Sequence, residues 1–513
     1  MLFESTQPEE LLKAYSGVKV IRELAGYDNG APQWGARLGI YHPLTGRTIG
    51  IPESNESWTV LDSLKDTKGD IGLMANKLGL SRGRIQVALN YLQECNLLLC
   101  QGSTFKETHE FEPVSAFTPE VYIQTTEACN LTCHGCAVGT DLQVTNQQAV
   151  INMSPKTLET GLERLTKAFI QQGHKKIKFK WAGGEPMMPK PFRLIQSGQE
   201  LVGRLSKAYP DLEIEQVIIT NGTFLTESNL QPLVGKNIKI AVSLWGLGSD
   251  NDEARGAIRP QDRYENIVAG IKRLHEMGFD YNINHVVTPG NADKFADFIR
   301  ALWDTKNSSY IGHDWNWTGS QIQPIALGIA FFRAQSQEDI AMLQKGGYER
   351  MVKGLRQGFE VIHELIMRGE SVPRLGKIDY LQLFDGVIAA PCGTGYNYVA
   401  LGPRGVAPCH EALFGMKPNI SELQSEADIL SLANAQFIGK EDLLLGQNVI
   451  FPKSLDDPTR LTLMHSGGTG CPRTSRDENN GQLGYATSIT EQLYAPILDE
   501  LLSLETMRRI QVS

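Results

Sequence analysis

Alternating apolar and polar residues predict a strand at residues 176–181, in which Ile177, Phe179 and Trp181 share one face. Helical periodicity separates this run from further strands of the same kind, which are predicted at 121–123, 215–219, 238–244 and 281–287. Strand and helix patterns alternate in this way from about residue 120 to 335. The pattern predicts an α/β fold built around a barrel of βα units.

Lys178 and Lys180 occupy the other face of the 176–181 strand. If the apolar face meets the outer helices, both lysines face the barrel interior near its reactive end, where a carboxylate would meet them. A solvated edge strand explains the same alternation equally well.

The first 112 residues predict a separate module, which ends in a polar stretch from Gln101 to Glu112. The module begins with a hairpin at 37–42 and 47–51, around a turn that contains Gly46. Three helical patterns follow, at 58–64, at 71–78 and from Ser81 onward. In the third pattern, the residues that share an apolar face are Ile85, Ala88, Leu89 and Leu92.

Two further segments follow the predicted barrel. Residues 337–369 predict a long helical segment with a break at Gly346-Gly347. Cys392 and Cys409 then bracket a Gly-rich, hairpin-like stretch. At 513 residues the chain is long for one domain and suggests three, because single domains typically run to ~100–200 residues.

Composition narrows the function classes. The net charge of −9 and the isoelectric point near 5.7 argue against a nucleic-acid binder, which normally carries a basic face. No run reaches the ~18 apolar residues of a membrane span, and the start lacks the pattern of a signal peptide, so we expect a cytoplasmic protein that binds no membrane. In that compartment clustered cysteines favour metal ligation, whereas Cys95 and Cys100 flank an apolar run and are expected to be buried thiols.

The most informative motif is a CxxxCxxC run, formed by Cys129, Cys133 and Cys136, just after the strand predicted at 121–123. Three thiolates at this spacing bind three corners of an iron–sulfur cube and leave the fourth iron open to a small ligand. A zinc site is the alternative, but zinc usually takes four ligands in two pairs.

This motif resembles the cluster-binding loop of the radical S-adenosylmethionine (radical SAM) superfamily, which follows the first strand of a partial (β/α)6 TIM-type barrel. Three further stretches resemble the family in the same order along the chain. Residues 181–186 (WAGGEP) are similar to its GGEP element, residues 219–223 to its fourth-strand motif, and residues 242–246 to the strand after that.

The resemblance implies a 4Fe–4S cluster on the three cysteines, whose open iron takes the methionine part of S-adenosylmethionine. It places Gly183, Gly184 and Glu185 beside the methionine amino group. It places polar contacts to the ribose and carboxylate at Thr220, Asn221 and Ser243. The residue before the third cysteine is often aromatic in this family, whereas here it is Gly135. The adenine contact is therefore unassigned, and His134 is either a hydrogen-bond partner near the cluster or a solvent-facing loop residue.

Residues 391–410 resemble the opening of a SPASM or twitch extension, which carries auxiliary iron–sulfur clusters. Cys392, Cys409 and Cys471 suffice for at most one such cluster, with its fourth iron open or bound by another group. Two alternatives remain: the three cysteines bind nothing, or they hold zinc with His410 or His465.

The hairpin followed by three helices resembles the PqqD-like leader-peptide recognition fold, which adds a precursor's leader to its hairpin edge as a strand. A generic winged helix is the alternative, although a basic recognition helix is lacking. The expected segments are the leader-recognition domain at 1–112, the radical SAM barrel at 118–335, a helical bridge at 336–385, a SPASM/twitch-like domain at 386–480 and a C-terminal helix at 481–513.

Together these resemblances predict a maturase of a ribosomally synthesised precursor peptide (a RiPP-type enzyme), with flavodoxin or ferredoxin as electron donor. Its 5′-deoxyadenosyl radical would abstract a hydrogen from the core peptide, and a C–C or C–S cross-link would follow. Epimerisation, backbone excision and anaerobic sulfatase maturation are enzymatic alternatives. A cluster-bearing, peptide-binding regulator is the non-enzymatic one. No residue indicates the general base, the precursor or the modified position.

Overall fold

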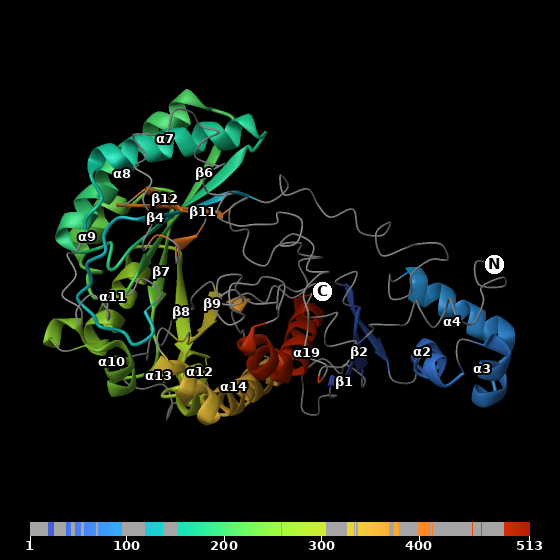
Figure 1. The fold of residues 1–513 in the computed structure, drawn as a ribbon. Helices are drawn as coiled ribbons and strands as arrows, with labels where there is room; N and C mark the ends of the chain where they lie inside the picture. The colour runs from blue at the N-terminus through green and yellow to red at the C-terminus, as the bar shows by residue number, and fades with distance from the viewer. Residues whose placement is uncertain are drawn as a thin grey trace.

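The structure is a computed structural model (Figure 1). The residues that it describes are 19–24, 37–42, 47–52, 56–67, 70–94, 118–136, 151–257, 259–303, 326–332, 334, 337–368, 374–378, 398–403, 405–407, 409–410, 413, 454, 463 and 487–512.

The N-terminal segment forms a three-stranded antiparallel sheet in the order β1-β2-β3, with β1 at Lys19–Leu24, β2 at Arg37–His42 and β3 at Arg47–Pro52. The predicted hairpin is the β2–β3 pair, in which Ile40 lies opposite Ile49. The strand β1 was not predicted, and it pairs with the other edge of β2.

Three helices follow this sheet, as predicted: α2 (Glu56–Asp66), α3 (Ile71–Leu78) and α4 (Arg82–Glu94). Side chains cap two of them, because Asp70 accepts a hydrogen bond from Leu73 N at 2.9 Å and Ser81 accepts one from Arg84 N at 3.3 Å. The predicted apolar face of α4 is buried: Ile85, Ala88, Leu89 and Leu92 are at most 3% exposed. Local periodicity therefore predicted this helical unit correctly.

The second sheet has nine strands in the order β10-β9-β8-β7-β6-β5-β4-β11-β12 (Figure 1). Strands β4 to β9 are all parallel and confirm the α/β architecture of a partial barrel. Their bounds are β4 Glu120–Gln124, β5 Lys176–Ala182, β6 Glu213–Thr220, β7 Ile238–Ser243, β8 Tyr281–Val287 and β9 Ala326–Phe331; the added strands are β10 Arg374–Ile378, β11 Tyr398–Gly402 and β12 Gly405–Ala407.

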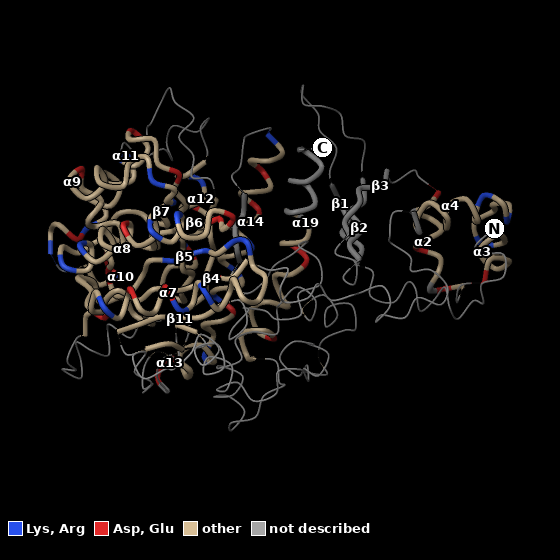
Figure 2. Tube along the Cα trace, turned by 90° about the horizontal axis from the view of Figure 1, so that it is seen from above, with Lys and Arg blue, Asp and Glu red and all other residues tan. Residues whose placement is uncertain are grey.

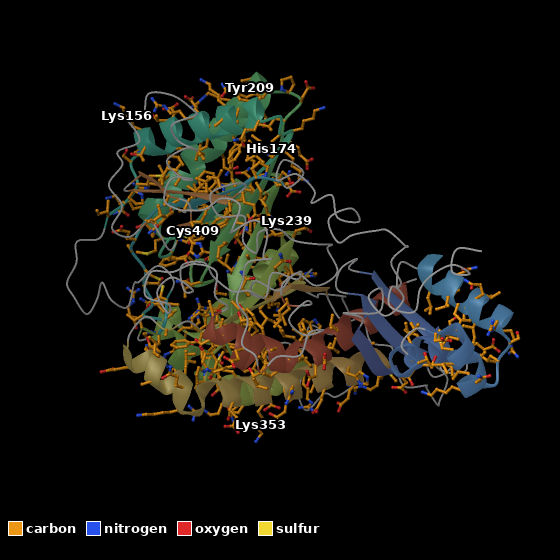
Figure 3. All side chains as sticks on the ribbon, turned by 45° about the vertical axis from the view of Figure 1, so that its right-hand side comes forward. Lys156, His174, Tyr209, Lys239, Lys353 and Cys409 are labelled. Carbon is orange, nitrogen blue, oxygen red and sulfur yellow. The ribbon has the colours of Figure 1, made fainter. Side chains whose placement is uncertain are left out.

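The helices between residues 155 and 303 alternate with these strands and cover one face of the sheet, whereas the C-terminal helix packs on the helix at 348–367 and on the N-terminal sheet (Figure 1). The helices are α7 Pro155–Gln171, α8 Pro189–Ala208, α9 Glu227–Leu230, α10 Ser249–Arg255, α11 Tyr264–Glu276, α12 Phe295–Trp303, α13 Gln337–Met342, α14 Tyr348–Met367 and α19 Ala495–Val512. Short 3-10 or π-helical turns are η2 Gln231–Leu233, η3 Pro260–Asp262, η4 Ala292–Lys294, η5 Leu343–Gly347 and η8 Thr490–Tyr494. The predicted break in the long helical segment is η5, where Gly346 has φ 97°. Lys353 of α14 points away from the barrel (Figure 3).

The apolar face of β5 lies in the core between the sheet and its helices, as predicted. Ile177, Phe179 and Trp181 are fully buried and belong to the same core cluster as Phe169 of α7 and Ile195 of α8. Burial of such large side chains supplies most of the favourable free energy of a core.

Lys178 and Lys180 lie on the opposite face of β5 and meet a carboxylate, as predicted. The predicted position near the reactive end is wrong, because this carboxylate belongs to Glu120, the first residue of β4, at the other end of the strand from the cysteine loop. The Nζ of Lys178 is 3.4 Å from Glu120 Oε1, and Lys180 pairs with Glu120 Oε2. The edge-strand alternative is wrong, because β5 lies between β4 and β6.

Two predicted domain boundaries differ from the observed sheet. The expected bridge at 336–385 contributes β10, which pairs with β9, and the expected extension at 386–480 contributes β11, which pairs with β4. The sheet therefore continues across the boundaries at 335 and 385, because the outer strands β4 and β9 of the six-stranded barrel each accept a further parallel strand. Strands β11 and β12 form the hairpin predicted between Cys392 and Cys409.

Charged residues of both signs are interspersed along the described elements (Figure 2). Within the described ranges, no helix has the length and apolar character that crossing a bilayer requires.

His285 of β8 provides a pH prediction, because its side chain is 1% exposed and burial lowers its pKa from 6.5 to about 3. The unfolded chain binds a proton below pH 6.5 while the folded chain does not, so stability falls as the pH drops from 6.5 toward 3, by roughly 5 kcal/mol in full. We expect His285→Phe, which fits beside Phe295 and Phe298, to remove much of this acid sensitivity. Urea unfolding of metal-free protein at pH 7.5 and pH 5 measures the difference. Equal pH dependence in both proteins would contradict the assignment.

Candidate functional site

The three motif cysteines lie in the loop that follows β4. Cys133 is buried in an apolar cluster with Leu131 and Trp245, and Cys129 and Cys136 pack against that cluster. All three are free thiols. Gly135 has φ 70°, a left-handed conformation that glycine adopts without strain, which accounts for glycine where the family often has an aromatic residue.

The surroundings of the thiols disfavour the thiolate form unless a positively charged group compensates it. Burial raises the pKa of the Cys129 thiol to about 12, and the nearby charges of Glu185, Cys133 and Cys136 act in the same direction, while the N–H of Leu131 opposes them. Burial also raises the pKa of Cys133, and Arg255 opposes that rise. Thiolates form at such a site when a metal centre compensates their charge, so the donor set fits an iron–sulfur cluster.

Among the described residues, no three His, Cys, Asp or Glu side chains converge on one metal ion. An iron–sulfur cluster on Cys129, Cys133 and Cys136, with zinc as the alternative, therefore stays a prediction.

The GGEP loop after β5 packs directly onto the cysteine loop. Gly184 N donates to Thr126 O at 2.8 Å, and Glu185 N donates to Ala128 O at 2.7 Å. A Cβ atom at Gly184 would lie 1.9 Å from Ala128 O, and one at Gly183 would lie 2.5 Å from Thr126 O. The two glycines are thus required for the close approach of the two loops.

Glu185 joins the GGEP loop to the end of β6. Its carboxylate is fully buried and accepts hydrogen bonds from Asn221 N at 2.6 Å, Thr220 Oγ1 at 2.7 Å and Met187 N at 2.8 Å. Burial raises its pKa to about 7 although these donors favour the ionised form. The contact to the methionine amino group, predicted from resemblance, remains a prediction.

Asn221 joins the end of β6 to the cysteine loop. Its Nδ2 donates to Asn130 Oδ1 at 2.8 Å and lies 3.7 Å from Cys129 Sγ. Asn130 Nδ2 in turn donates to Asp262 at 2.6 Å, and Asp262 is 1% exposed. Through these bonds three predicted elements form one connected unit: the cysteine loop, the GGEP loop and the stretch at residues 219–223.

Sequence analysis missed a fourth component, Arg255 at the end of α10. This residue is 2% exposed, and its Nη1 donates to Asn221 O at 3.1 Å and to Ser243 O at 2.5 Å. It therefore connects the ends of β6 and β7 beside Cys133. Arg255 occurs in a run of residues with charges of both signs, a pattern typical of a solvent-exposed surface. No hydrophobic periodicity predicts that its side chain is buried.

His134 takes a position between the two predicted alternatives. Its side chain is 66% exposed, yet Nε2 lies 2.8 Å from Asp339 Oδ1 of α13, and its ring stacks on Phe332 at 5.3 Å. His134 therefore connects the cysteine loop to the end of β9 and to α13. The prediction of a solvent-facing histidine is also confirmed, because most of the side chain is exposed.

The predicted auxiliary site is described only at Cys409, which is buried next to the β11–β12 hairpin (Figure 3). Cys392, Cys471 and His465 lie outside the described residues. His410 is hydrogen-bonded to Tyr398 at 2.9 Å and packs 4.9 Å from the ring of Tyr122 on β4. The auxiliary cluster, like the cofactor contacts of Gly183, Thr220 and Ser243, stays a prediction.

Comparison with known proteins identifies the segment that carries this site. Residues 123–302 match the family model of the Radical SAM superfamily. This segment belongs to the radical SAM superfamily. The match contains the three cysteines and every residue predicted to contact S-adenosylmethionine.

The curated relatives are distant from this chain. The serine-type anaerobic sulfatase-maturating enzyme of Bacteroides thetaiotaomicron is 26% identical over 170 residues, which are 33% of this chain and 39% of that enzyme. The S-adenosylmethionine-dependent nucleotide dehydratase of Lacinutrix mariniflava is 29% identical over 188 residues, which are 35% of this chain and 36% of that one. The matches thus span well under half of each relative.

Among solved structures, native anSMEcpe with bound AdoMet superimposes with a TM-score of 0.53 at 17% identity, over 76% of this chain and 99% of that one. A second structure, polyhistidine-tagged anSMEcpe with bound AdoMet, gives a TM-score of 0.52 at 16% identity, over 77% and 96%. At this identity the likeness concerns the fold.

Proposed function

We propose that this protein is a radical SAM enzyme that modifies a ribosomally synthesised precursor peptide by forming an intramolecular C–C or C–S cross-link. The observation that carries the radical SAM assignment is the connected unit of loops at the ends of β4, β5 and β6. Gly184 and Glu185 bind the cysteine loop, and Glu185 and Asn221 bind each other. Such preorganisation suits a site that orients a cofactor.

In this proposal Cys129, Cys133 and Cys136 hold a 4Fe–4S cluster. Cluster and S-adenosylmethionine together supply a 5′-deoxyadenosyl radical when both are bound. The chain's own residues orient the site: Gly184 allows the close approach of two loops, Glu185 fixes their spacing, and Arg255 ties the ends of β6 and β7 together. The face of the sheet that carries Lys178 and Lys180 would receive the substrate.

The peptide substrate is supported by the N-terminal segment. Its β2–β3 hairpin and three helices agree with the elements of a leader-recognition domain, although a winged helix has similar elements. Binding the leader there would raise the effective concentration of a weakly held core peptide at the barrel. Flavodoxin or ferredoxin would supply the first electron. An auxiliary cluster on Cys392, Cys409 and Cys471 would accept the electron that cross-linking releases.

A sulfatase-maturation-like reaction is the second candidate. It is favoured by the matches to the serine-type anaerobic sulfatase-maturating enzymes of Bacteroides thetaiotaomicron and Klebsiella aerogenes. This alternative also modifies a polypeptide, but it gives no role to a leader-binding module.

Mass spectrometry of a candidate substrate tests the proposal. The reconstituted protein is incubated anaerobically with S-adenosylmethionine, reductant and the short peptide encoded beside its gene. We expect the peptide to lose the mass of two hydrogen atoms and to acquire a cross-link in tandem spectra, only when its leader is present. Turnover of a sulfatase-derived peptide without a leader would favour the second candidate.

A further inference from the structure

Trp245, in the loop after β7, carries an indole N–H without an acceptor among the described residues. The side chain is 8% exposed, and its Nε1 atom is buried. An unsatisfied buried donor costs about 1–3 kcal/mol. Native proteins rarely leave such a group unpaired, so its place beside the motif cysteines decides what acceptor it would meet.

The chain holds the backbone of Trp245 in place from both sides. Its N–H donates to Asn251 Oδ1 at 3.1 Å, and its carbonyl accepts from Asn291 Nδ2 at 2.8 Å. Both asparagines are almost fully buried, at 0% and 3% exposure. Two buried amide side chains thus fix one loop residue, which is the support that a functional side chain requires.

The surroundings of Trp245 identify the bound group. Its ring packs with Leu131 and Cys133, and the other two motif cysteines border the same cluster. The guanidinium of Arg255 lies 5.8 Å from the centre of the ring, and Arg255 Nε is also buried without an acceptor among the described residues. The unpaired indole N–H of Trp245 therefore lies in the same cluster as the Cys133 thiol, to which the Arg255 side chain already donates, and sulfur is the further acceptor that a bound cluster would bring there.

We propose that the indole N–H of Trp245 donates a hydrogen bond to a sulfur atom of the cluster held by Cys133 and thereby raises its reduction potential. Hydrogen bonds to sulfur favour the reduced, more negative cluster. Trp245 is a positioning residue in this role, since it acts through the cluster. The inference rests on the proposed function only in that a cluster must bind at the three cysteines.

The first test uses the unaltered protein, reconstituted without S-adenosylmethionine and labelled with ¹⁵N at the indole nitrogen of tryptophan. Pulsed electron paramagnetic resonance of the reduced cluster should detect a coupled ¹⁵N nucleus and an exchangeable proton. Absence of both signals would overturn the proposal. Couplings that arise only after S-adenosylmethionine is added would also overturn it, because the acceptor would then be the cofactor.

The second test compares Trp245→Phe with a matched control. Phenylalanine keeps an aromatic ring beside Arg255 but lacks the indole N–H. The midpoint potential of the cluster should therefore shift to a more negative value, and the ¹⁵N coupling should be lost. Trp303→Phe removes another buried indole N–H without a partner among the described residues, but from the main core, and should leave both unchanged. Equal potentials in Trp245→Phe and the unaltered protein would overturn the proposal.

Iron content and 5′-deoxyadenosine formation, measured on the same samples, separate this inference from the proposed function. Absence of the coupling in unaltered protein with intact iron and intact cofactor cleavage would reject the role of Trp245 alone. Absence of a cluster in the unaltered protein would reject the proposed function itself.

Discussion

Replacing Gly184 with alanine is expected to lower the rate of S-adenosylmethionine cleavage by roughly 100-fold. The new Cβ would lie 1.9 Å from Ala128 O and 2.9 Å from Glu127 O, and both are backbone atoms that no side-chain rotation moves away. The cysteine loop must shift, at a cost of about 3 kcal/mol or more. A displacement of about 1 Å in such a site lowers the rate by roughly 100-fold. Iron content after anaerobic reconstitution and the rate of 5′-deoxyadenosine formation measure both effects.

Gly203→Ala is the control for this substitution. Gly203 lies in α8, and no atom comes within 4 Å of a Cβ placed there. Alanine in a helix is favoured over glycine by about 0.5–1 kcal/mol, so this variant should be slightly more stable and fully active. Normal cluster content and activity in Gly184→Ala would show that the contact of the two loops is not required.

Replacing Glu185 with alanine is expected to give the second largest effect. The substitution leaves the backbone N–H groups of Asn221 and Met187 and the hydroxyl of Thr220 without their acceptor. Two unsatisfied buried amides and a cavity lower the free energy of unfolding by roughly 3–5 kcal/mol. Chemical denaturation of metal-free protein measures the change.

The matched control is Glu200→Ala on the exposed face of α8, which should alter stability by no more than about 0.5 kcal/mol. Glu185→Ala should also assemble less cluster, because Glu185 fixes the spacing of the loops that carry Asn221 and the cysteines. Similar stability of the two variants would contradict the role assigned to Glu185.

The elements of the barrel were predictable because their signals are local. Alternation marked β5 as a two-faced strand, and both faces meet the partners expected of them. The strands β1, β9 and β10 were not predicted, since a short strand is decided by the neighbour that it pairs with rather than by its own residues. For the same reason the domain boundary at residue 335 did not anticipate that β10 extends the sheet.

The motifs of the site were predictable, but the hydrogen bonds that connect them were not. Spacing and order identified the cysteines, the GGEP element and Asn221, and the structure brings them together. The roles of Arg255 and Asp262 depend on burial and on partners that lie far away in the chain. Arg255 bonds to Asn221, more than 30 residues away, and Asp262 bonds to Asn130, more than 130 residues away. A single sequence carries no periodic signal for buried charges of this kind.

The most direct test of the radical SAM assignment compares the unaltered protein with a variant in which Cys129, Cys133 and Cys136 are all alanine. Both are reconstituted with iron and sulfide without oxygen, reduced, and supplied with S-adenosylmethionine. We expect the unaltered protein to form 5′-deoxyadenosine, and the variant to form none and to hold about four fewer iron ions. Equal iron content in the two proteins, or no 5′-deoxyadenosine from a fully loaded unaltered protein, would contradict it.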